Sequence, residues 1–262
     1  MNTFEDKVIW VTGASSGLGA EIARQSAAKG AKVILSARNV EKLNQLCGEL
    51  KNSSEHLVVP LDLEHSSNFD EVVQTVIEKY GRIDALFNNG GISQRSEAAA
   101  TNLEIDRRIM EINYFGNVAL TKAVLPIFQK QQSGHFIVVS SIAGKFGFFL
   151  RSAYSASKHA LHGFYESLML EEAKNNIQVT IACPGKINTD ISVNALNESG
   201  TATGVMDDNQ SNGMSAEECI RQLLVAVKKG KKEVLIGNKE IKAVTLKRFF
   251  PKMFWKVIKK QQ

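Results

Sequence analysis

A tyrosine and a lysine four positions apart, Tyr154 and Lys158, are the pair of residues best suited to proton chemistry in this chain. On a helix this spacing places both side chains on one face. An ammonium group near a phenol favours the phenolate, so it lowers the pKa of the phenol and makes it a usable acid near neutral pH. Ser141 lies 13 residues before the tyrosine and can hydrogen-bond the substrate oxygen that receives the proton. The three residues therefore predict proton transfer to an oxygen atom.

A glycine-rich turn near the N-terminus predicts a dinucleotide site. Gly13, Gly17 and Gly19 follow an apolar run and open a stretch of helical character. Such a turn lets the backbone approach a pyrophosphate, and the helix N-terminus attracts its charge. The spacing is GxxxGxG rather than GxGxxG, so an ordinary tight turn is the alternative. We expect the cofactor to contact the rest of this turn as well, namely Ser15, Ser16 and Leu18.

The residues after the second apolar run predict which dinucleotide binds. An NAD site usually places a carboxylate here, where it accepts hydrogen bonds from the ribose hydroxyls. Ala37 removes that negative charge, and the guanidinium of Arg38 suits a 2′-phosphate. We therefore expect NADP(H), the alternative being that Arg38 is a solvated surface residue. Asp62 and Leu63 follow the third apolar run, in position to contact the adenine.

Short apolar runs alternate with longer amphipathic stretches along the chain, which predicts the elements that position these residues. The runs predict strands over residues 8–11, 32–36, 56–59, 83–87, 136–139, 179–183 and 234–236. The stretches predict helices over residues 17–29, 41–50, 69–80, 103–130 and 153–174. Continuous apolar strands that are each followed by a helix indicate an α/β fold, a doubly wound parallel sheet of about seven strands with helices on both faces. This Rossmann architecture binds ligands beyond the carboxyl ends of its strands.

The bulk composition is that of one globular domain. The 262 residues are 44% hydrophobic and 23% charged, which is ordinary for such a protein. No apolar stretch reaches about 18 residues, and the first residues lack the basic flank and apolar core of a signal peptide. The cysteines form no CxxC, which argues against a disulfide framework or a zinc site, and Cys183 is expected to be buried and inert. We expect a reducing, cytoplasmic compartment.

Positive charge is concentrated at the C-terminal end. Residues 239–262 hold eight Lys or Arg and one Glu, whereas the other 238 residues hold 24 basic and 26 acidic residues. This distribution does not suggest a nucleic-acid-binding domain, which spreads its basic residues over a folded face. We therefore divide the chain into a nucleotide-binding domain over residues 1–238 and a basic amphipathic tail over residues 239–262.

The tail mixes its basic residues with large apolar ones, and three arrangements stay open. It can lie peripherally on a membrane, dock on the body or on a partner subunit, or be disordered. Pro251 is expected to start a new short helix within it.

One loop-like region is rich in Asn, Ser, Gly, Thr and Asp and covers residues 192–215. Pro184 and Gly185 open the segment that leads to it, so we expect a substrate loop over about residues 186–215. Two histidines, His159 and His162, follow Lys158 on the predicted helix. We interpret them as surface or packing residues, because no carboxylate joins them at metal-ligand spacing, and we expect no metal site.

Taken together, the motifs resemble the short-chain dehydrogenase/reductase family in its single-domain form, over about residues 5–238. The segment from Thr12 to Gly19 is similar to the TGxxxGxG of this family, and residues 88–91 are similar to its NNAG, with Gly90 in place of alanine. Asn113 stands where the family keeps a catalytic asparagine. The segment from Pro184 to Thr189 resembles the PGxxxT that holds the nicotinamide amide.

Three further segments resemble one branch of this family, the dehydrogenase/reductase members 7 and 7B. They are Tyr154–Leu161, Ser192–Ala195 and Gly204–Asp207. That branch is largely membrane-associated, and we expect this chain to depart from it in lacking an N-terminal anchor. The resemblance therefore says little about the compartment.

The resemblance implies an enzyme that interconverts a carbonyl and a secondary alcohol (a CH–OH donor) with NADP(H), as a reductase of an apolar or lipid-like small molecule. It makes Tyr154 the general acid and Ser141 the residue that orients the carbonyl. It makes Lys158 the residue that depresses the pKa of the tyrosine and holds the nicotinamide ribose. Asn113 would kink its helix and anchor a water that leads protons in. Further cofactor contacts are expected from Asn89, Pro184, Gly185, Ile187 and Thr189.

The segment between Ser141 and Tyr154 borders the site in such relatives. Phe146, Phe148 and Phe149 therefore either line an apolar substrate pocket or belong to the core.

A second hypothesis is a non-catalytic NADP-binding sensor or scaffold, because the fold alone does not decide function. Sensors on this fold often lose the tyrosine, so the intact set favours the enzyme. The resemblance also implies a homo-oligomer, a dimer or tetramer that pairs the helices near residues 103–130 and 153–174. A monomer maintained by the tail is the alternative.

Overall fold

The computed structural model describes residues 3–206 and 211–259 of the chain. Asp207, which ends one of the motifs above, and Lys260 of the tail lie outside the described residues.

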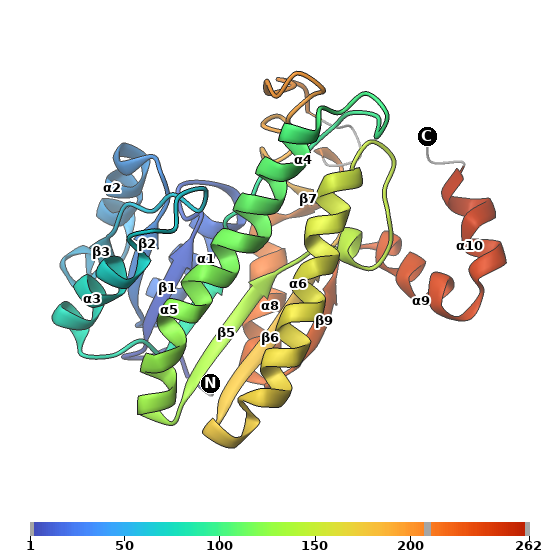
Figure 1. Cartoon of the computed structure of the whole chain (residues 1–262). Helices are drawn as coiled ribbons and strands as arrows, with labels where there is room; N and C mark the ends of the chain where they lie inside the picture. The colour runs from blue at the N-terminus through green and yellow to red at the C-terminus, as the bar shows by residue number, and fades with distance from the viewer. Residues whose placement is uncertain (1–2, 207–210, 260–262) are drawn as a thin grey trace.

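Seven parallel strands form the central sheet, in the order β3-β2-β1-β4-β5-β6-β9 (Figure 1). Each of the seven predicted strands is present, and the doubly wound fold is confirmed. The apolar runs are continuous because both faces of the sheet are covered, so that all five residues of β1 are buried. The strands are β1 (Val8–Thr12), β2 (Lys32–Ser36), β3 (Leu57–Val58), β4 (Ala85–Asn88), β5 (Gly134–Val139), β6 (Ile177–Pro184) and β9 (Glu233–Ile236).

The strand order reverses between β1 and β4, because the chain first builds outward through β2 and β3 and then returns to the other side of β1. Such a reversal leaves a crevice beyond the carboxyl ends of the two strands. Thr12 ends β1 and Asn88 ends β4, so the predicted glycine turn and the segment after Asn88 meet there.

Helices cover both faces of the sheet, and each face has its own apolar core. Ile9 and Val11 belong to the core shared with α1, α2 and α8, whereas Val8 and Trp10 belong to the core shared with α3, α5 and α6. In Figure 1, α5 and α6 lie side by side in front of the sheet, and α1 and α8 lie behind it. The helices are α1 (Gly17–Ala28), α2 (Val40–Glu49), α3 (Phe69–Tyr80), α4 (Leu103–Met110), α5 (Gly116–Gln131), α6 (Ser152–Glu171), α8 (Ala216–Lys228), α9 (Lys242–Phe249) and α10 (Pro251–Ile258).

One helix, α8, was not predicted, although its sequence carries the signal. Ile220, Leu223, Leu224 and Val227 are buried at helical spacing. Ser215 caps the helix, since its side chain accepts a hydrogen bond from the backbone of Glu218. This spacing is an ordinary amphipathic pattern, and it directly follows the polar loop of residues 192–215.

The single helix expected over residues 103–130 is divided by a turn of π-helix at Glu111–Phe115. This turn separates α4 from α5 and contains Asn113 at its centre, fully buried. A π-turn inserts one extra residue and changes the direction of side chains, often at a functional site.

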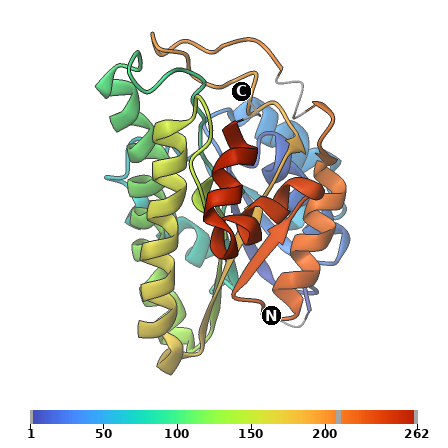
Figure 2. The ribbon, with the colours of Figure 1, turned by 90° about the vertical axis from the view of Figure 1, so that its right-hand side faces the viewer.

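The tail forms two short helices, α9 and α10, which stand at the side of the body in Figure 1 and appear between α6 and α8 in the view of Figure 2. They pack against the segment that contains Ile142, Phe146 and Phe148. As predicted, Pro251 begins the second of them. Phe254 is 1% exposed, and its ring meets the ring of Phe146 edge to face at a centroid distance of 5.0 Å. Lys247 Nζ also donates a hydrogen bond to the carbonyl of Lys145 at 2.9 Å. Of the three arrangements left open, the described part of the tail adopts docking on the body.

Among the described residues, none of the helices combines the length and hydrophobicity needed to cross a bilayer.

Candidate active site

A cavity of about 640 Å³ lies at the carboxyl ends of the strands, where the strand order reverses. We name it the strand-end cavity. Two predicted site residues, Gly19 and Asn113, are not part of its wall. The predicted residues that line it are Gly13, Ser15, Ser16, Gly17, Leu18, Arg38, Asp62, Leu63, Asn89, Ser141, Tyr154, Lys158, Pro184, Gly185, Ile187 and Thr189.

The glycine turn has the backbone geometry that only glycine adopts easily. Gly13 and Gly17 have φ values of +64° and +52°. Gly19 fits where no other residue would, because a Cβ there would lie 2.1 Å from the carbonyl oxygen of Gly13. Ser16 precedes α1 without a side-chain cap, so the first N–H groups of the helix stay available. The partial positive charge and the available N–H groups of this helix N-terminus suit a pyrophosphate.

Asn89 acts on the turn from the neighbouring strand. Its side-chain nitrogen donates to the carbonyl of Thr12 at 3.0 Å. Thr12 Oγ1 in turn accepts from the backbone nitrogens of Asn89 and Gly90, both at 3.0 Å. Gly90 replaces alanine at a tight place, since a Cβ there would lie 2.6 Å from Leu63 Cδ1. The smaller residue therefore gives the side chain of Leu63 room against the cavity wall.

The end of the cavity beside β2 carries positive charge. Arg38 is exposed, lines the cavity, and makes no ion pair with the residues that the structure describes. Lys42, one turn into α2, lines the same wall. Asn39 begins this helix, and its side chain accepts a hydrogen bond from the backbone of Lys42. Two cations thus face the region where a ribose phosphate would lie.

Tyr154 and Lys158 share one face of α6, as their spacing predicts. Lys158 Nζ lies 5.7 Å from the centroid of the tyrosine ring. The lysine is 4% exposed, and its ammonium donates to the carbonyl of Val139 at 2.8 Å. Burial lowers the pKa of Lys158 to about 8. Ser141 begins a short turn after β5, where its hydroxyl accepts from the backbone of Ala143 at 3.1 Å.

The pKa of Tyr154 moves in the direction opposite to the one that its spacing from lysine suggests. Burial of the phenol raises the pKa, whereas the charge of Arg151 and a hydrogen bond with Ser141 lower it by less. Lys158 is not among these causes, so the expected lowering of the tyrosine pKa by the lysine is not borne out.

Asn113 lies behind this face and holds the chain after β4. Its Oδ1 accepts from the backbone nitrogen of Ile92 at 2.8 Å, and its Nδ2 donates to the carbonyl of Ile92 at 2.9 Å and to Ser157 Oγ at 3.0 Å. A Cβ placed on Gly91 would lie 3.0 Å from Asn113 Oδ1 and 3.6 Å from Lys158 Nζ. The asparagine and the lysine therefore converge on the same glycine.

Two residues that the sequence analysis missed, Gln94 and Arg151, fix the start of α6. Gln94 is fully buried, and its Oε1 accepts from the backbone nitrogens of Ala153 at 2.9 Å and Tyr154 at 3.4 Å. Arg151 donates to Ser93 Oγ at 2.7 Å and to the carbonyl of Gln94 at 3.1 Å. No spacing rule marks a glutamine that caps a helix from another segment, so this role cannot be predicted from the sequence.

The polar loop lies over the strand-end cavity and is bound to the segment after β4. The backbone of Leu196 donates to Ser93 at 2.9 Å and accepts from Arg95 at 2.8 Å. At the two ends of the loop, β7 (Ile187–Asn188) and β8 (Met214–Ser215) pair in parallel. Asn194, Leu196 and Ala202 reach the cavity wall.

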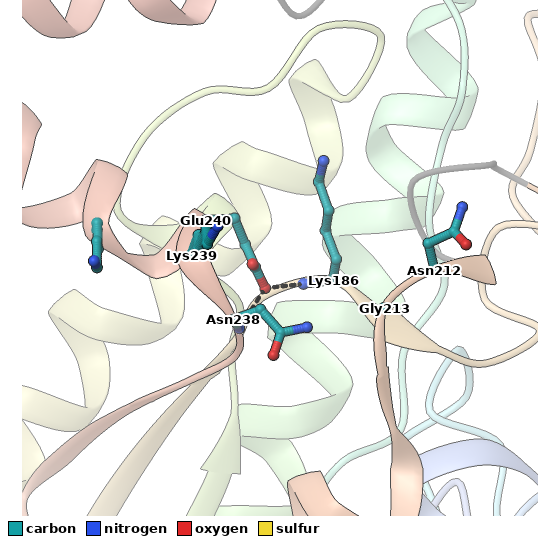
Figure 3. Close-up of a pocket in the computed structure, with 7 residues that line it drawn as sticks. Lys186, Asn212, Gly213, Asn238, Lys239 and Glu240 are labelled. Carbon is teal, nitrogen blue, oxygen red and sulfur yellow. Dashed lines mark hydrogen bonds between the residues drawn. The ribbon is translucent and has the colours of Figure 1, made fainter.

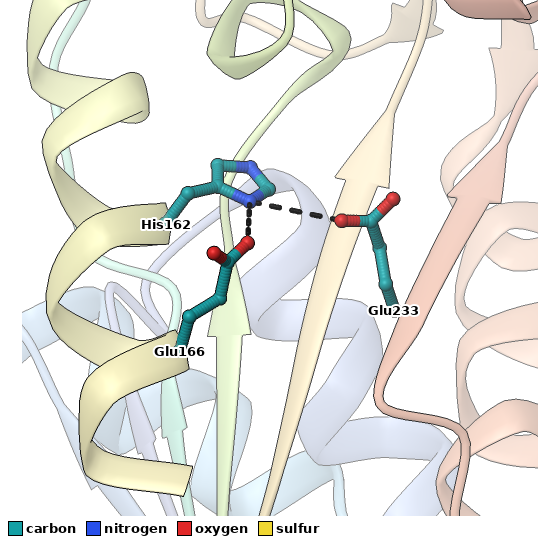
Figure 4. Close-up of side chains that lie close together, drawn as sticks. All are labelled: His162, Glu166 and Glu233. Atoms are coloured by element: carbon teal, nitrogen blue, oxygen red, sulfur yellow. Dashed lines mark ion pairs between the residues drawn. The ribbon is translucent and has the colours of Figure 1, made fainter. Parts of the chain in front are cut away.

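The expectation that no carboxylate accompanies the histidines is wrong for His162 (Figure 4). Its Nδ1 lies 3.6 Å from Glu166 and 3.8 Å from Glu233. Glu166 is one helical turn from His162 on α6, so its spacing could have revealed it. Glu233 comes from β9, a distant part of the chain. Lys145 Nζ lies 3.2 Å from the same nitrogen and pairs with Glu233, so an ammonium already neutralises one of the two carboxylates.

His162 is a buried packing residue, as expected. Burial, and then the charge of Lys145, lower its pKa to about 4. His159 is exposed. Cys183 is fully buried, and burial raises the pKa of its thiol to about 12, which agrees with the inert role expected of it.

The three phenylalanines after Ser141 have different surroundings. Phe146 is buried, and with the half-buried Phe148 it faces the tail rather than the strand-end cavity. Phe149 is 56% exposed.

Comparison with known proteins agrees with this architecture. A family model described as short chain dehydrogenase matches residues 7–200. A mouse (Mus musculus) protein named dehydrogenase/reductase SDR family member 7B is 42% identical over 257 residues, which cover 96% of this chain and 80% of the mouse protein.

Two solved structures share the fold. A short chain dehydrogenase/reductase from Burkholderia phymatum in complex with NAD has a TM-score of 0.86 at 21% identity and covers 97% of this chain and 96% of its own. A short chain dehydrogenase from Burkholderia cenocepacia J2315 in complex with NADP has a TM-score of 0.82 at 24% identity, with 98% of each chain covered. The fold therefore accompanies either cofactor.

Proposed function

The chain belongs to the short-chain dehydrogenase family and is an oxidoreductase of that family. We propose that it transfers hydride between NADP(H) and a carbonyl or secondary alcohol. The observation that carries the proposal is that Ser141, Tyr154 and Lys158 line the same cavity as the glycine turn. When bound, the nicotinamide cofactor supplies the hydride.

The residues present fit a dinucleotide. The uncapped start of α1 offers N–H groups to a pyrophosphate, and Gly13 lets the glycine turn pack closely against Gly90 and Asn89. Lys158 lines the same cavity, and its ammonium can hold a ribose hydroxyl there. At the other end, Arg38 and Lys42 support a preference for the 2′-phosphate of NADP(H), because the end of β2 offers no carboxylate to the ribose.

In the reductive direction, Tyr154 gives its proton to the carbonyl oxygen, and Ser141 hydrogen-bonds the same oxygen and orients it. The phenolate that remains is stabilised by the ammonium of Lys158. Asn113 keeps the segment after β4 in place beside this ammonium and anchors the water that returns a proton.

The substrate is apolar in this proposal. Ile92, Ile112, Ile191 and Leu196 line the part of the strand-end cavity that lies between the chain after β4 and the polar loop. Apolar walls with a few convergent polar groups are typical of small-molecule sites.

The proposal extends to the surface. The tail helices expose Phe249 and Trp255 among basic residues, which supports peripheral contact with a membrane. Phe115 is 53% exposed on the outer side of the α4–α5 junction, and Leu170 is 78% exposed on α6. These residues support a homo-oligomer that pairs α5 and α6.

The test is NADPH consumption with a panel of apolar ketones and aldehydes, beside NADPH binding measured by fluorescence. Turnover that disappears in Tyr154→Phe while NADPH still binds supports the enzyme. If NADPH binds and no member of the panel or of the matching alcohols is converted, the protein is a non-catalytic NADP-binding sensor or scaffold instead.

A further inference from the structure

A second cavity lies beneath the tail, apart from the strand-end cavity. We name it the tail cavity; its volume is about 500 Å³, within the range of small-molecule pockets. Among the described residues, none lines both cavities. Its walls are mostly apolar and come from the segment after Ser141 and from the inner side of the tail helices, including Ile142, Phe146, Phe148, Leu246, Val257 and Ile258.

The rim of the tail cavity is basic. An adjoining hollow of about 590 Å³ shares four residues with it: Lys186, Lys239, Lys242 and Glu240 (Figure 3). Glu240 Oε1 accepts from the backbone nitrogens of Lys186 at 3.0 Å and Asn238 at 3.1 Å, so its charge is directed at the backbone. The three ammonium groups outnumber this one carboxylate and make the rim positive.

An apolar chamber with a cationic rim fits a molecule of two parts. An alkyl chain gains free energy when it leaves water for apolar walls, and an anionic headgroup is attracted to clustered lysines. We propose that the tail cavity binds an amphiphile with one long alkyl chain and a phosphate or carboxylate headgroup. The occupant is either a free amphiphile or a lipid of the membrane on which the tail rests.

The tail cavity lies directly behind the wall of the proposed active site. Ile142 directly follows Ser141, and Lys186 lies between Gly185 and Ile187. Ser141, Gly185 and Ile187 line the strand-end cavity, whereas Ile142 and Lys186 line the tail cavity. One thickness of backbone separates the two.

The first experiment is calorimetric titration of the full chain with decyl phosphate below its micelle concentration, with NADPH saturating so that the cofactor site is occupied. Inorganic phosphate and 1-decanol present the headgroup and the chain alone. We expect decyl phosphate to bind at one site per chain, decanol to bind more weakly, and phosphate to give no heat. The absence of decyl phosphate binding overturns the proposal.

Four variants locate the bound molecule. Ala243→Trp and Thr245→Trp each fill the tail cavity and should abolish binding; Thr245 is exposed, so its variant tests the cavity even if Ala243→Trp does not fold. Lys186→Gln with Lys242→Gln should weaken decyl phosphate by about fivefold or more and leave decanol unchanged. Lys252→Gln with Lys256→Gln, on α10 outside the lining, is the matched control and should bind as the unmodified chain does. If both tryptophan variants bind decyl phosphate as tightly as the unmodified chain does, the amphiphile binds elsewhere and the proposal is refuted.

Vesicles distinguish the two sources. Phosphatidylcholine vesicles with and without phosphatidylglycerol are sedimented with the unmodified chain and the tryptophan variants. Reduced sedimentation of the variants identifies a membrane lipid as the occupant, whereas equal sedimentation with lost decyl phosphate binding identifies a free amphiphile. Neither readout uses turnover, so failure of the proposed reaction and failure of this site are seen separately.

Discussion

Asn113 and Ile92 exchange two hydrogen bonds, so that the amide of the asparagine completes the backbone of the segment after β4 as a neighbouring strand would. The π-turn aims the asparagine inward, and the same amide reaches Ser157 on α6. Three parts of the chain are thereby fixed around the ammonium of Lys158. Through these contacts the asparagine acts as a positioning residue.

Tyr154→Phe is expected to lower kcat by about 100-fold or more, because general acid catalysis contributes roughly 10²–10⁴-fold. The ring keeps its packing, so the Kd for NADPH should stay within about twofold. Steady-state kinetics and NADPH fluorescence measure the two quantities. Retention of more than a few per cent of kcat would remove the tyrosine from its proposed role.

Ala37→Asp with Arg38→Leu is expected to move cofactor preference from NADPH toward NADH. The charge-assisted hydrogen bond that is lost is worth about 1.5–3 kcal/mol, or roughly 10- to 150-fold in affinity, and the exposure of Arg38 favours the lower end. The ratio of kcat/KM for the two cofactors is the measurement. Arg24→Leu, at an exposed arginine paired with Glu49 on α2, is the control and should leave the ratio unchanged. Equal kcat/KM for both cofactors in the unmodified protein contradicts the premise.

Lys158→Met is expected to lose turnover and NADPH affinity together, and to change how stability depends on pH. Folding lowers the pKa of this lysine from 10.5 to about 8, so the unfolded chain binds the proton more tightly. The charged lysine therefore costs stability fully below pH 8, and this cost disappears as the pH rises toward 10.5.

Between these pH values the unmodified protein should gain stability over the methionine variant by up to about 1.4 kcal/mol per pH unit. Urea unfolding of both proteins from pH 7 to 10.5 measures the difference. Lys29→Met, at an exposed lysine, should show no such trend. Parallel stability curves for the unmodified protein and Lys158→Met would mean that the lysine is not desolvated.

Phe254→Ala is expected to release the tail without unfolding the body. A buried phenylalanine is worth about 3–5 kcal/mol in a core, but undocking of two short helices limits the loss. Amide exchange should therefore accelerate over residues 242–258, while the main melting transition moves little. Trp255→Ala, at a neighbour that is 51% exposed, is the control. An equal acceleration over the sheet would show that the tail is part of the global fold.

The full chain is expected to sediment with anionic vesicles at low salt and less at high salt, because lysine and arginine residues attract anionic headgroups through a screened field. A chain that ends at Ile241 should stay in solution. Vesicles of neutral lipid are the control. If this truncated chain sediments as well as the full one, another surface binds, and the loop over residues 192–206 is the next to test.

The fold was predictable because its signals are local. Apolar runs such as Val8–Val11 need both faces covered, and a tyrosine with a lysine four positions later shares one face of a helix with it. The remaining features depend on contacts between distant parts of the chain. The cap that Gln94 places on α6, the glutamate that β9 brings to His162, and the meeting of Phe146 with Phe254 have no spacing that a sequence could reveal. The direction of the Tyr154 pKa likewise depends on burial, which spacing does not give.

The tail helices have two working surfaces, and Phe254 and Lys247 hold them to the body between these surfaces. The inner surface closes the tail cavity, and the outer one carries the exposed rings of Phe249 and Trp255. A binding partner that separates the tail from the body, in order to contact more of its aromatic rings, would open the tail cavity. Membrane contact and amphiphile binding are therefore compatible only while Phe254 and Lys247 keep the tail docked. A membrane that binds the tail too strongly would undock it and release the amphiphile from the tail cavity.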